Sequence, residues 1–330
     1  MAQPWTCRSC CPPGCFAESD SSSPTRYPLP YIPRRTHPVK LTRHPDNPIL
    51  EPIASHAWES RTVFNCGVID HGDEIVLIYR AQGHDGNVSR LGYAASHDGV
   101  HFERRPEPVF VPETPEEAKG VEDPRLTLLD GRVEMLYTAW SEDNIQVARA
   151  STTDFRTWQR HGIAIPGPDN KDAALFPRKV NGRYCAFHRI PSSMWIAWSG
   201  DLETWGDYQK IMDPRPGRYD DVRLGAGGPP IDTELGWLVI YHGADQDNIY
   251  SLGVALLDRD DPSKVLNRPK EPILVPEEPW ELVGDVPNVV FTCGTAELGD
   301  DYLIYYGGAD RVIALATANK RDLLDYAANG

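Results

Sequence analysis

Residues 70–80 read DHGDEIVLIYR, and the same arrangement of a turn followed by an apolar, aromatic-rich strand returns four more times along the chain. Asp-Gly and Asn-Gly pairs at such turns are strong hairpin signals. The later copies are DGRVEMLYTAW (130–140), NGRYCAFHR (181–189), LGWLVIYHG (235–243) and GDDYLIYYGG (299–308). The chain is therefore built from five repeats, and we take the repeated strand as the first strand of each.

A second strand, rich in small residues, follows each repeated strand. In three repeats it ends in a polar turn of the form Ser/Thr-x-Asp-x-x-x-aromatic, as in SHDGVHF (96–102). The period of about 50–60 residues is that of one four-stranded blade with its loops. We predict an all-β chain folded as a five-bladed β-propeller, because a β-sandwich would not explain the period.

The composition excludes several classes of partner. A net charge of −15 argues against nucleic acid, which needs a basic surface. No apolar run approaches the ~20 residues that span a bilayer, and the N-terminus lacks the basic and apolar regions of a signal peptide. We therefore expect no membrane association and a cytoplasmic protein. An anionic substrate would have to be held by a few locally placed cations.

The N-terminal residues differ from the rest of the chain. Residues 1–36 are rich in Cys, Ser and Pro and are expected to be a disordered leader, with residues 37–330 forming the catalytic propeller. Cys7, Cys10, Cys11 and Cys15 have a spacing that also fits zinc or an iron–sulfur centre, but no apolar segment nearby would fold around a metal. Cys66, Cys185 and Cys293 lie in apolar segments and are interpreted as buried free thiols.

Polar side chains stand at the ends of the repeated strands, where a propeller places its central funnel. They are Arg80, His188, Arg189, His242 and Asp310. Sugar recognition needs aromatic faces and planar polar groups, which Phe64, Asn65, Arg80, Arg90, Tyr241 and Asp310 supply. Trp140 and Trp195 are either stacking platforms or core residues.

The segment GVEDPR (120–125) carries the most distinctive chemistry. Asp123 precedes a proline, which favours an extended backbone. One interpretation is a turn in which Asp123 pairs with Arg125. The other is a general acid in the funnel, with a pKa raised by burial or by the neighbouring carboxylate.

Glycoside cleavage normally uses two carboxyl groups. If phosphate is the attacking group, cations replace the second carboxylate, and Lys171, Arg189 and His242 could converge to bind it. No metal or other cofactor is needed for that chemistry, in which inorganic phosphate is the co-substrate.

Ten motifs in order resemble glycoside hydrolase family 130 over roughly residues 40–325. They are FNCGV, YRAQ, SRLGYAAS-x-DG, GVEDPRLT, KDAALFP, FHRI, GGPPI, WLVIYHG, VPNVVF and YYGGAD. The resemblance implies a five-bladed propeller that cleaves β-1,4- or β-1,2-linked manno-oligosaccharides with phosphate, with inversion, to α-mannose 1-phosphate. It also allows a homo-oligomer.

The same resemblance implies roles for individual residues. Asp123 matches the general acid, which is thought to act through a sugar hydroxyl. Phosphate-binding positions correspond to Lys171, Arg189, His242 and Tyr250, with Lys171 in place of an arginine found in some members. Sugar-binding positions correspond to Asn65, Arg80, Arg90 and Asp310. The alternatives are an inverting β-mannosidase that uses water, which would lack the basic set, and a sugar-binding propeller without catalysis.

Overall fold

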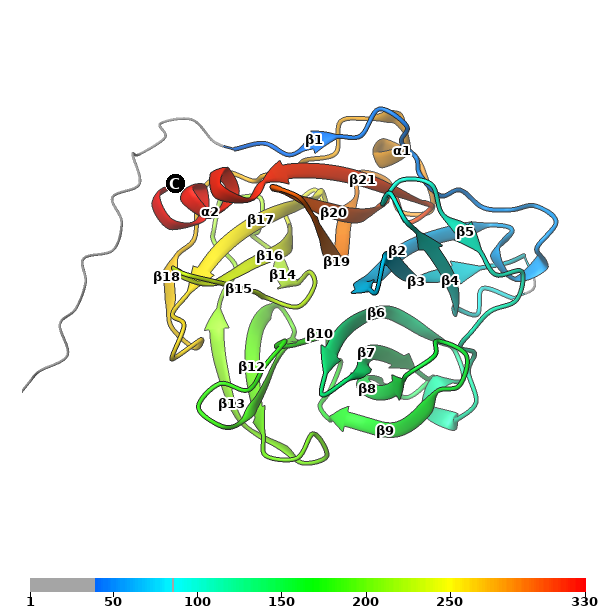
Figure 1. Cartoon of the computed structure of the whole chain (residues 1–330), viewed down its shortest axis with the longest axis horizontal. Helices are drawn as coiled ribbons and strands as arrows, with labels where there is room; N and C mark the ends of the chain where they lie inside the picture. The colour runs from blue at the N-terminus through cyan, green and yellow to red at the C-terminus, as the bar shows by residue number, and fades with distance from the viewer. Residues whose placement is uncertain (1–38, 85) are drawn as a thin grey trace, which may run out of the picture. The chain divides into compact units, whose positions relative to one another are not determined.

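The computed structural model describes residues 39–84 and 86–330, in which five antiparallel sheets form a ring. The first sheet contains β2 (Thr62–His71), β3 (Glu74–Gln82), β4 (Arg90–Ser96) and β5 (Glu103–Arg104). The second contains β6 (Gly120–Leu129), β7 (Arg132–Trp140), β8 (Ile145–Thr152) and β9 (Gln159–Ile165). The third contains β10 (Lys171–Leu175), β11 (Tyr184–Ile190), β12 (Ser193–Ser199) and β13 (Trp205–Met212). The prediction of a five-bladed β-propeller is confirmed (Figure 1).

The last two sheets complete the ring. The fourth contains β14 (Arg223–Ala226), β15 (Ile231–Thr233), β16 (Gly236–Ala244), β17 (Tyr250–Leu257) and β18 (Val265–Asn267). The fifth contains β19 (Val290–Leu298), β20 (Asp301–Gly308) and β21 (Val312–Asn319), and its outermost strand is β1 (Thr42–Arg43) from the other end of the sequence. Because Thr42 pairs with Thr317, both ends of the propeller sequence share one blade and close the ring.

The innermost strands are β2, β6, β10, β14 and β19, which contact one another around the centre. The repeated apolar strands are β3, β7, β11, β16 and β20, the second strand of each blade. Taking the repeated strand as the first of each blade was therefore wrong. The innermost strands are harder to recognise because two of them, β10 and β14, have only five and four residues.

The hairpin and turn signals correspond to defined backbone geometry. Asp130-Gly131 and Asn181-Gly182 have positive φ at both residues, as a type I′ hairpin turn requires. In the polar turns, the Asp98 side chain accepts hydrogen bonds from the backbone N–H groups of Val100 and His101, and Asp154 and Asp201 do the same in the next two blades. The recurring Asp thus satisfies donors that the strand leaves unpaired.

Three blades share a buried cluster of glutamate, tyrosine and arginine. The glutamates lie in short helical turns, η1 (Ala57–Glu59), η2 (Pro115–Glu117) and α1 (Pro279–Leu282). Each accepts a hydrogen bond from a tyrosine of the second strand and contacts an arginine of the rim strand. The clusters are Glu59 with Tyr79 and Arg104, Glu117 with Tyr137 and Arg160, and Glu281 with Tyr306 and Arg43. They connect the centre of a blade to its rim.

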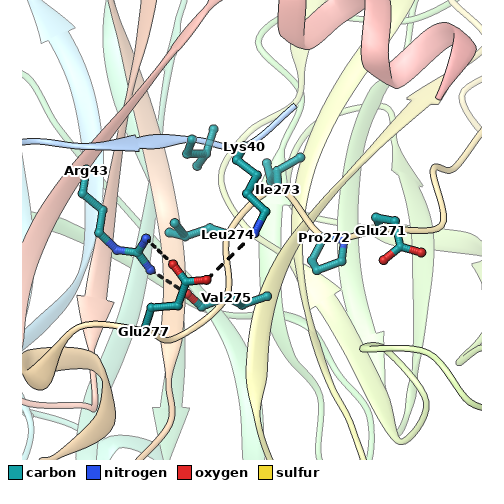
Figure 2. A pocket seen from close by; sticks show the side chains of 9 residues that line it. Lys40, Arg43, Glu271, Pro272, Ile273, Leu274, Val275 and Glu277 are labelled. Carbon is teal, nitrogen blue, oxygen red and sulfur yellow. Dashed lines mark hydrogen bonds and ion pairs between the residues drawn. The ribbon is translucent and has the colours of Figure 1, made fainter. Parts of the chain in front are cut away.

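Arg43 also borders a cavity of about 240 Å³ beside β1, formed with the segment that follows β18. Figure 2 shows Arg43 and Lys40 directed at the carboxylate of Glu277 on its wall. None of the predicted site residues lines this cavity.

The core lies between neighbouring blades, as where Phe176, Phe187 and Trp237 pack together. Cys66, Cys185 and Cys293 are buried free thiols, as predicted. The chain ends in α2 (Lys320–Asn329), and no helix of the described residues is long and apolar enough to cross a membrane. The predicted leader and its four cysteines lie outside the described residues.

Candidate active site

Three consecutive innermost strands carry a bulge at the same place. Asn65 in β2, Asp123 in β6 and Asp172 in β10 have φ values of 45°, 49° and 53°. Each sits where the register with the second strand shifts. A bulge redirects a side chain, and Asn and Asp tolerate this left-handed conformation best among residues with a Cβ. The extended backbone predicted for Asp123 from Pro124 is therefore wrong, because the bulge determines its conformation.

The residue before each bulge pairs with a position near the end of the second strand. The pairs are Phe64 with Arg80, Glu122 with Thr138 and Lys171 with Arg189. This register explains why Arg80 and Arg189, predicted from strand ends, lie beside the bulged residues.

Asp123 lies among groups from the first blade. Asn65 Nδ2 donates to its Oδ1 at 3.0 Å, and Arg80 Nη1 lies 3.2 Å from the same oxygen. Arg80 also contacts Glu122 at 2.5 Å and donates to Ser89 at 2.9 Å. Asn65, Arg80 and Asp123, which were predicted to share a site, therefore do so.

The charge state of Asp123 differs from the prediction. Burial alone would raise its pKa, but the charges of Arg80 and Arg125 and the hydrogen bond from Asn65 outweigh burial and lower it. The predicted pKa increase belongs instead to its neighbours. Burial raises the pKa of Glu122, and it raises the pKa of Asp310 to about 7. The free protein therefore has an ionised Asp123 beside two carboxyls that hold protons more readily.

Arg125 spans the centre of the ring instead of pairing with the Asp123 carboxylate. Its guanidinium donates to the carbonyl oxygens of Gly227 at 2.9 Å, Ala226 at 3.0 Å and Asp123 at 2.8 Å. It is almost completely buried. The alternative interpretation of an Asp123–Arg125 turn pair is thus not what the structure shows, and Arg125 joins the second blade to the fourth.

Asp172 forms a second charged centre one blade further on. Its Oδ2 lies 2.8 Å from Arg189 Nη1 and 3.3 Å from His242 Nε2, and its Oδ1 lies 3.4 Å from Arg125 Nη2. The charges of the two arginines and the contact with His242 lower its pKa well below the usual range despite burial. Arg189 and His242, predicted to converge, are therefore brought together by a carboxylate that the sequence did not single out.

Of the other predicted residues, Lys171, Tyr250 and Asp310 interact with members of these two centres. Lys171 begins β10 and its charge lowers the pKa of Glu122 against the effect of burial. Tyr250 begins β17 and its ring centroid lies 6.2 Å from that of His242. Arg90 begins β4 and donates to the carbonyl of Val88. Asp310 follows β20 with a φ of 52°, and its charge acts on Arg80.

Sequence reasoning missed Asp172, the path of Arg125 and the packing of Phe291 against His242, with ring centroids 4.1 Å apart. The only local signal was the KDA sequence that begins β10. Of the two tryptophans considered as platforms, Trp140 has 36% of its surface exposed at the end of β7, and Trp195 lies within β12.

Comparison with known proteins agrees with this geometry. Residues 40–329 match the family model Glyco_hydro_130, described as beta-1,4-mannooligosaccharide phosphorylase. A 1,2-beta-oligomannan phosphorylase of Thermoanaerobacter sp. (strain X514) is 45% identical over 86% of this chain and 99% of its own length, and a beta-1,2-mannobiose phosphorylase of the same organism is 46% identical over 85% and 98%. The beta-1,2-mannobiose phosphorylase of Listeria innocua, solved with beta-1,2-mannobiose, superposes with a TM-score of 0.81 at 31% identity over 87% of this chain and 99% of that one. A five-bladed ring with these motifs at its centre, matched over nearly its whole length, belongs to glycoside hydrolase family 130.

Proposed function

We propose that this protein is a glycoside phosphorylase that cleaves β-mannosides with inorganic phosphate and inverts the anomeric configuration, with Asp123 as the general acid. The observation that carries the proposal is the placement of two charged centres around the bulged aspartates of two adjacent innermost strands, β6 and β10. One is the carboxyl of Asp123, and the other is the group that Arg189 and His242 form around Asp172. Family membership supports the same activity.

The reaction needs one proton and one nucleophile. A phosphate oxygen attacks the anomeric carbon, the bond from that carbon to the glycosidic oxygen breaks, and the leaving oxygen takes the proton of Asp123, directly or through a sugar hydroxyl. The products are α-mannose 1-phosphate and the shortened sugar. Both contacts of Asp123 with Asn65 and Arg80 use Oδ1, which leaves Oδ2 to contact the substrate.

The proton must reach Asp123 when the substrates bind, because the pKa of this carboxyl is lowered in the free protein. A phosphate dianion bound at Arg189 and Lys171 adds negative charge near Asp123, and negative charge raises the pKa of a carboxyl. Formation of the complex with both substrates therefore converts Asp123 from a base to an acid. Sugar-binding roles for Asn65, Arg80, Arg90 and Asp310, and a phosphate-binding role for Tyr250, belong to the same proposal.

The linkage that we propose is β-1,2. Both Thermoanaerobacter relatives carry β-1,2 names at 45% and 46% identity, and so does the Listeria structure. β-1,4 is named in the description of the family model and in the name of a Ruminococcus albus phosphorylase that is 31% identical.

The decisive experiment incubates the purified protein with β-1,2-mannobiose or β-1,4-mannobiose, each with and without inorganic phosphate. ³¹P NMR then identifies the product and its anomer. We expect α-mannose 1-phosphate only when phosphate is present, and faster from the β-1,2 substrate. Free mannose formed equally fast without phosphate would establish the hydrolase instead. A faster β-1,4 reaction would overturn the linkage, and no turnover of either would leave only sugar binding.

The remaining parts of the proposal concern the surroundings of the enzyme. A cytoplasmic location suits an enzyme whose co-substrate and product are charged phosphates, and cell fractionation tests it. Because side chains supply the positive charge at the phosphate, we expect EDTA to leave the rate unchanged. A homo-oligomer remains a prediction for light scattering to test.

A further inference from the structure

Asp172 is a buried carboxylate at the centre of the ring, outside the set of residues to which a role has been given above. Only 1% of its surface is exposed. The groups around it come from three blades, Arg125 from the second, Arg189 from the third and His242, whose pKa burial lowers, from the fourth. Such an arrangement is costly to assemble, because each charge must leave water.

The contacts of this cluster place opposite charges together but leave hydrogen-bonding capacity unused. Asp172 Oδ2 is close to both Arg189 and His242, yet neither N–H points at it well enough for a hydrogen bond. Both ring nitrogens of His242 are buried without a hydrogen-bond partner among the described residues. Buried polar atoms of this kind are rare unless a ligand or water completes them.

The backbone is also shaped around the cluster. Gly225 in β14 pairs with His242, and a Cβ at this position would lie 2.5 Å from Asp172 Oδ2 and 2.8 Å from His242 Nε2. The φ of Gly225 is not in the left-handed region, so the glycine is needed here for space and not for backbone conformation. The carboxylate and the imidazole therefore meet only because β14 has no side chain at this point.

We propose that Asp172 is a positioning residue that holds Arg189 and His242 in the orientation in which they receive phosphate. The inference rests on the proposed phosphorolysis. Asp172 fixes one nitrogen of the Arg189 guanidinium and leaves the others for phosphate oxygens, since a guanidinium has a planar fork of donors. It sets the His242 ring by its approach to Nε2. Its negative charge also offsets the mutual repulsion of Arg125 and Arg189 in the free protein.

Glu134, a buried carboxylate away from the centre of the ring, serves as a comparison because its contacts are those of a residue that only stabilises the fold. Glu134 is equally buried and contacts Arg149 at 3.1 Å and Arg132 at 2.9 Å. Both of these contacts are directed hydrogen bonds, and neither glutamate oxygen is left without a partner. The Asp172 cluster differs because its hydrogen bonds are incomplete.

Two substitutions test the proposal, Gly225→Ala and Asp172→Asn. The first inserts a methyl group between the carboxylate and the imidazole without altering any charge. The second removes the charge with little change of shape. For each we expect the KM for inorganic phosphate to rise by about tenfold or more. This is the effect of losing one charge-assisted hydrogen bond between the protein and phosphate. The KM for the mannoside should change less than threefold.

Phosphate binding is measured a second time without turnover, as the increase in melting temperature that inorganic phosphate causes. We expect this increase to shrink in both variants. Gly200→Ala is the control for the methyl group, because nothing lies within 4 Å of a Cβ there. Glu134→Gln is the control for loss of a buried carboxylate, and it should lower the melting temperature while leaving the KM for phosphate unchanged.

The outcomes separate this inference from the proposed function. If the wild-type protein forms no mannose 1-phosphate, the function itself is wrong. If it does, but Gly225→Ala retains its KM for phosphate and its phosphate-induced melting shift, Asp172 has only a structural role. Should Asp172→Asn fail to fold, Gly225→Ala still decides, and an equal rise of both KM values in that variant would also overturn the proposal.

Discussion

Asp123 and Asp172 occupy the same bulge in neighbouring blades, with the same left-handed backbone, yet their surroundings are opposite. Asp123 shares one arginine, Arg80, with a second carboxylate, and 7% of its surface is exposed. Asp172 is enclosed by Arg125, Arg189 and His242. The repeat supplies two equivalent carboxylates, and the neighbours supplied by other blades give them different chemistry.

The difference shows how a repeated fold acquires one active site. Where carboxylates outnumber cations, as around Arg80, protons are held readily and exchanged. Burial raises the pKa of Asp310 and Glu122 there, and the arginines keep Asp123 ionised until substrate arrives. Where cations outnumber carboxylates, as around Asp172, the excess positive charge suits an anion. Proton donation and phosphate binding, the two requirements of phosphorolysis, are thus assigned to the surroundings of Asp123 in β6 and of Asp172 in β10.

The largest effect should come from Asp123→Asn, which removes the acid from the first centre and leaves the second intact. We expect the rate of mannose 1-phosphate formation to fall by about 10³-fold, within the range for loss of a general acid. The circular dichroism spectrum and the phosphate-induced melting shift should be retained. If Asp123→Asn keeps most of its activity, another residue is the general acid. The different surroundings of Asp123 and Asp172 would then not explain catalysis.

Next in size is Arg80→Met, which takes away the cation that Asp123 and Glu122 share. We expect kcat/KM at neutral pH to fall by about 10²-fold, because Arg80 orders Asp123 as well as lowering its pKa. Without that charge the pKa of Asp123 rises, so the alkaline limb of the pH profile moves to higher pH.

Arg104→Met is the matched control for Arg80, since Arg104 contacts the buried Glu59 in the same blade. It should cost stability and leave the pH profile in place. An unshifted alkaline limb in Arg80→Met would show that this arginine does not control the ionisation of Asp123.

Local sequence was sufficient to predict the fold and the centre around Asp123, but not the centre around Asp172. Asn-Gly and Asp-Gly turns such as Asn181-Gly182 act within a hairpin, so the five-fold period was visible without tertiary information. Asp172 was missed because two of its three partners, Arg125 and His242, come from other blades, and Arg125 is 47 residues away. The pKa of Asp123 was predicted in the wrong direction because Arg80, the larger of the two charges that lower it, comes from another blade.

A smaller effect, on stability alone, is expected from Glu117→Gln in the cluster away from the axis. Glu117 is buried and accepts a hydrogen bond from Tyr137 at 2.6 Å, with Arg160 at 3.3 Å. Loss of its charge weakens two charge-assisted contacts and should lower the free energy of unfolding by about 2 kcal/mol. Urea unfolding measures this, and the kinetic constants should not change. A change in the KM for phosphate would contradict the proposal that only carboxylates at the centre of the ring, such as Asp123 and Asp172, take part in function.

Among the residues at the axis, the smallest effect on the rate should be that of Asp310→Asn, which tests the centre around Arg80 where carboxyls hold protons readily. Burial, together with the nearby Asp123 and Glu122, raises the pKa of Asp310 to about 7 despite the charge of Arg80. In the folded protein this carboxyl keeps a proton that the unfolded chain releases at about pH 4. The unfolded state therefore binds fewer protons between about pH 4 and pH 7, and the stability of the wild type falls as pH rises through that window, by at most roughly 1.4 kcal/mol per pH unit.

The asparagine variant should lose this slope, which urea unfolding at pH 5 and pH 8 would measure. Near pH 6 the amide resembles the protonated carboxyl of Asp310, so kcat/KM should stay within about tenfold of the wild type. The inflection near pH 7 in the kcat/KM profile, which we assign to Asp310, should disappear. If the inflection persists, it belongs to Glu122, the other carboxyl whose pKa burial raises. In that case the carboxyl that holds the proton next to Asp123 is its neighbour in β6. The difference between Asp123 and Asp172 would then depend on residues of β6 and β10 and not on Asp310.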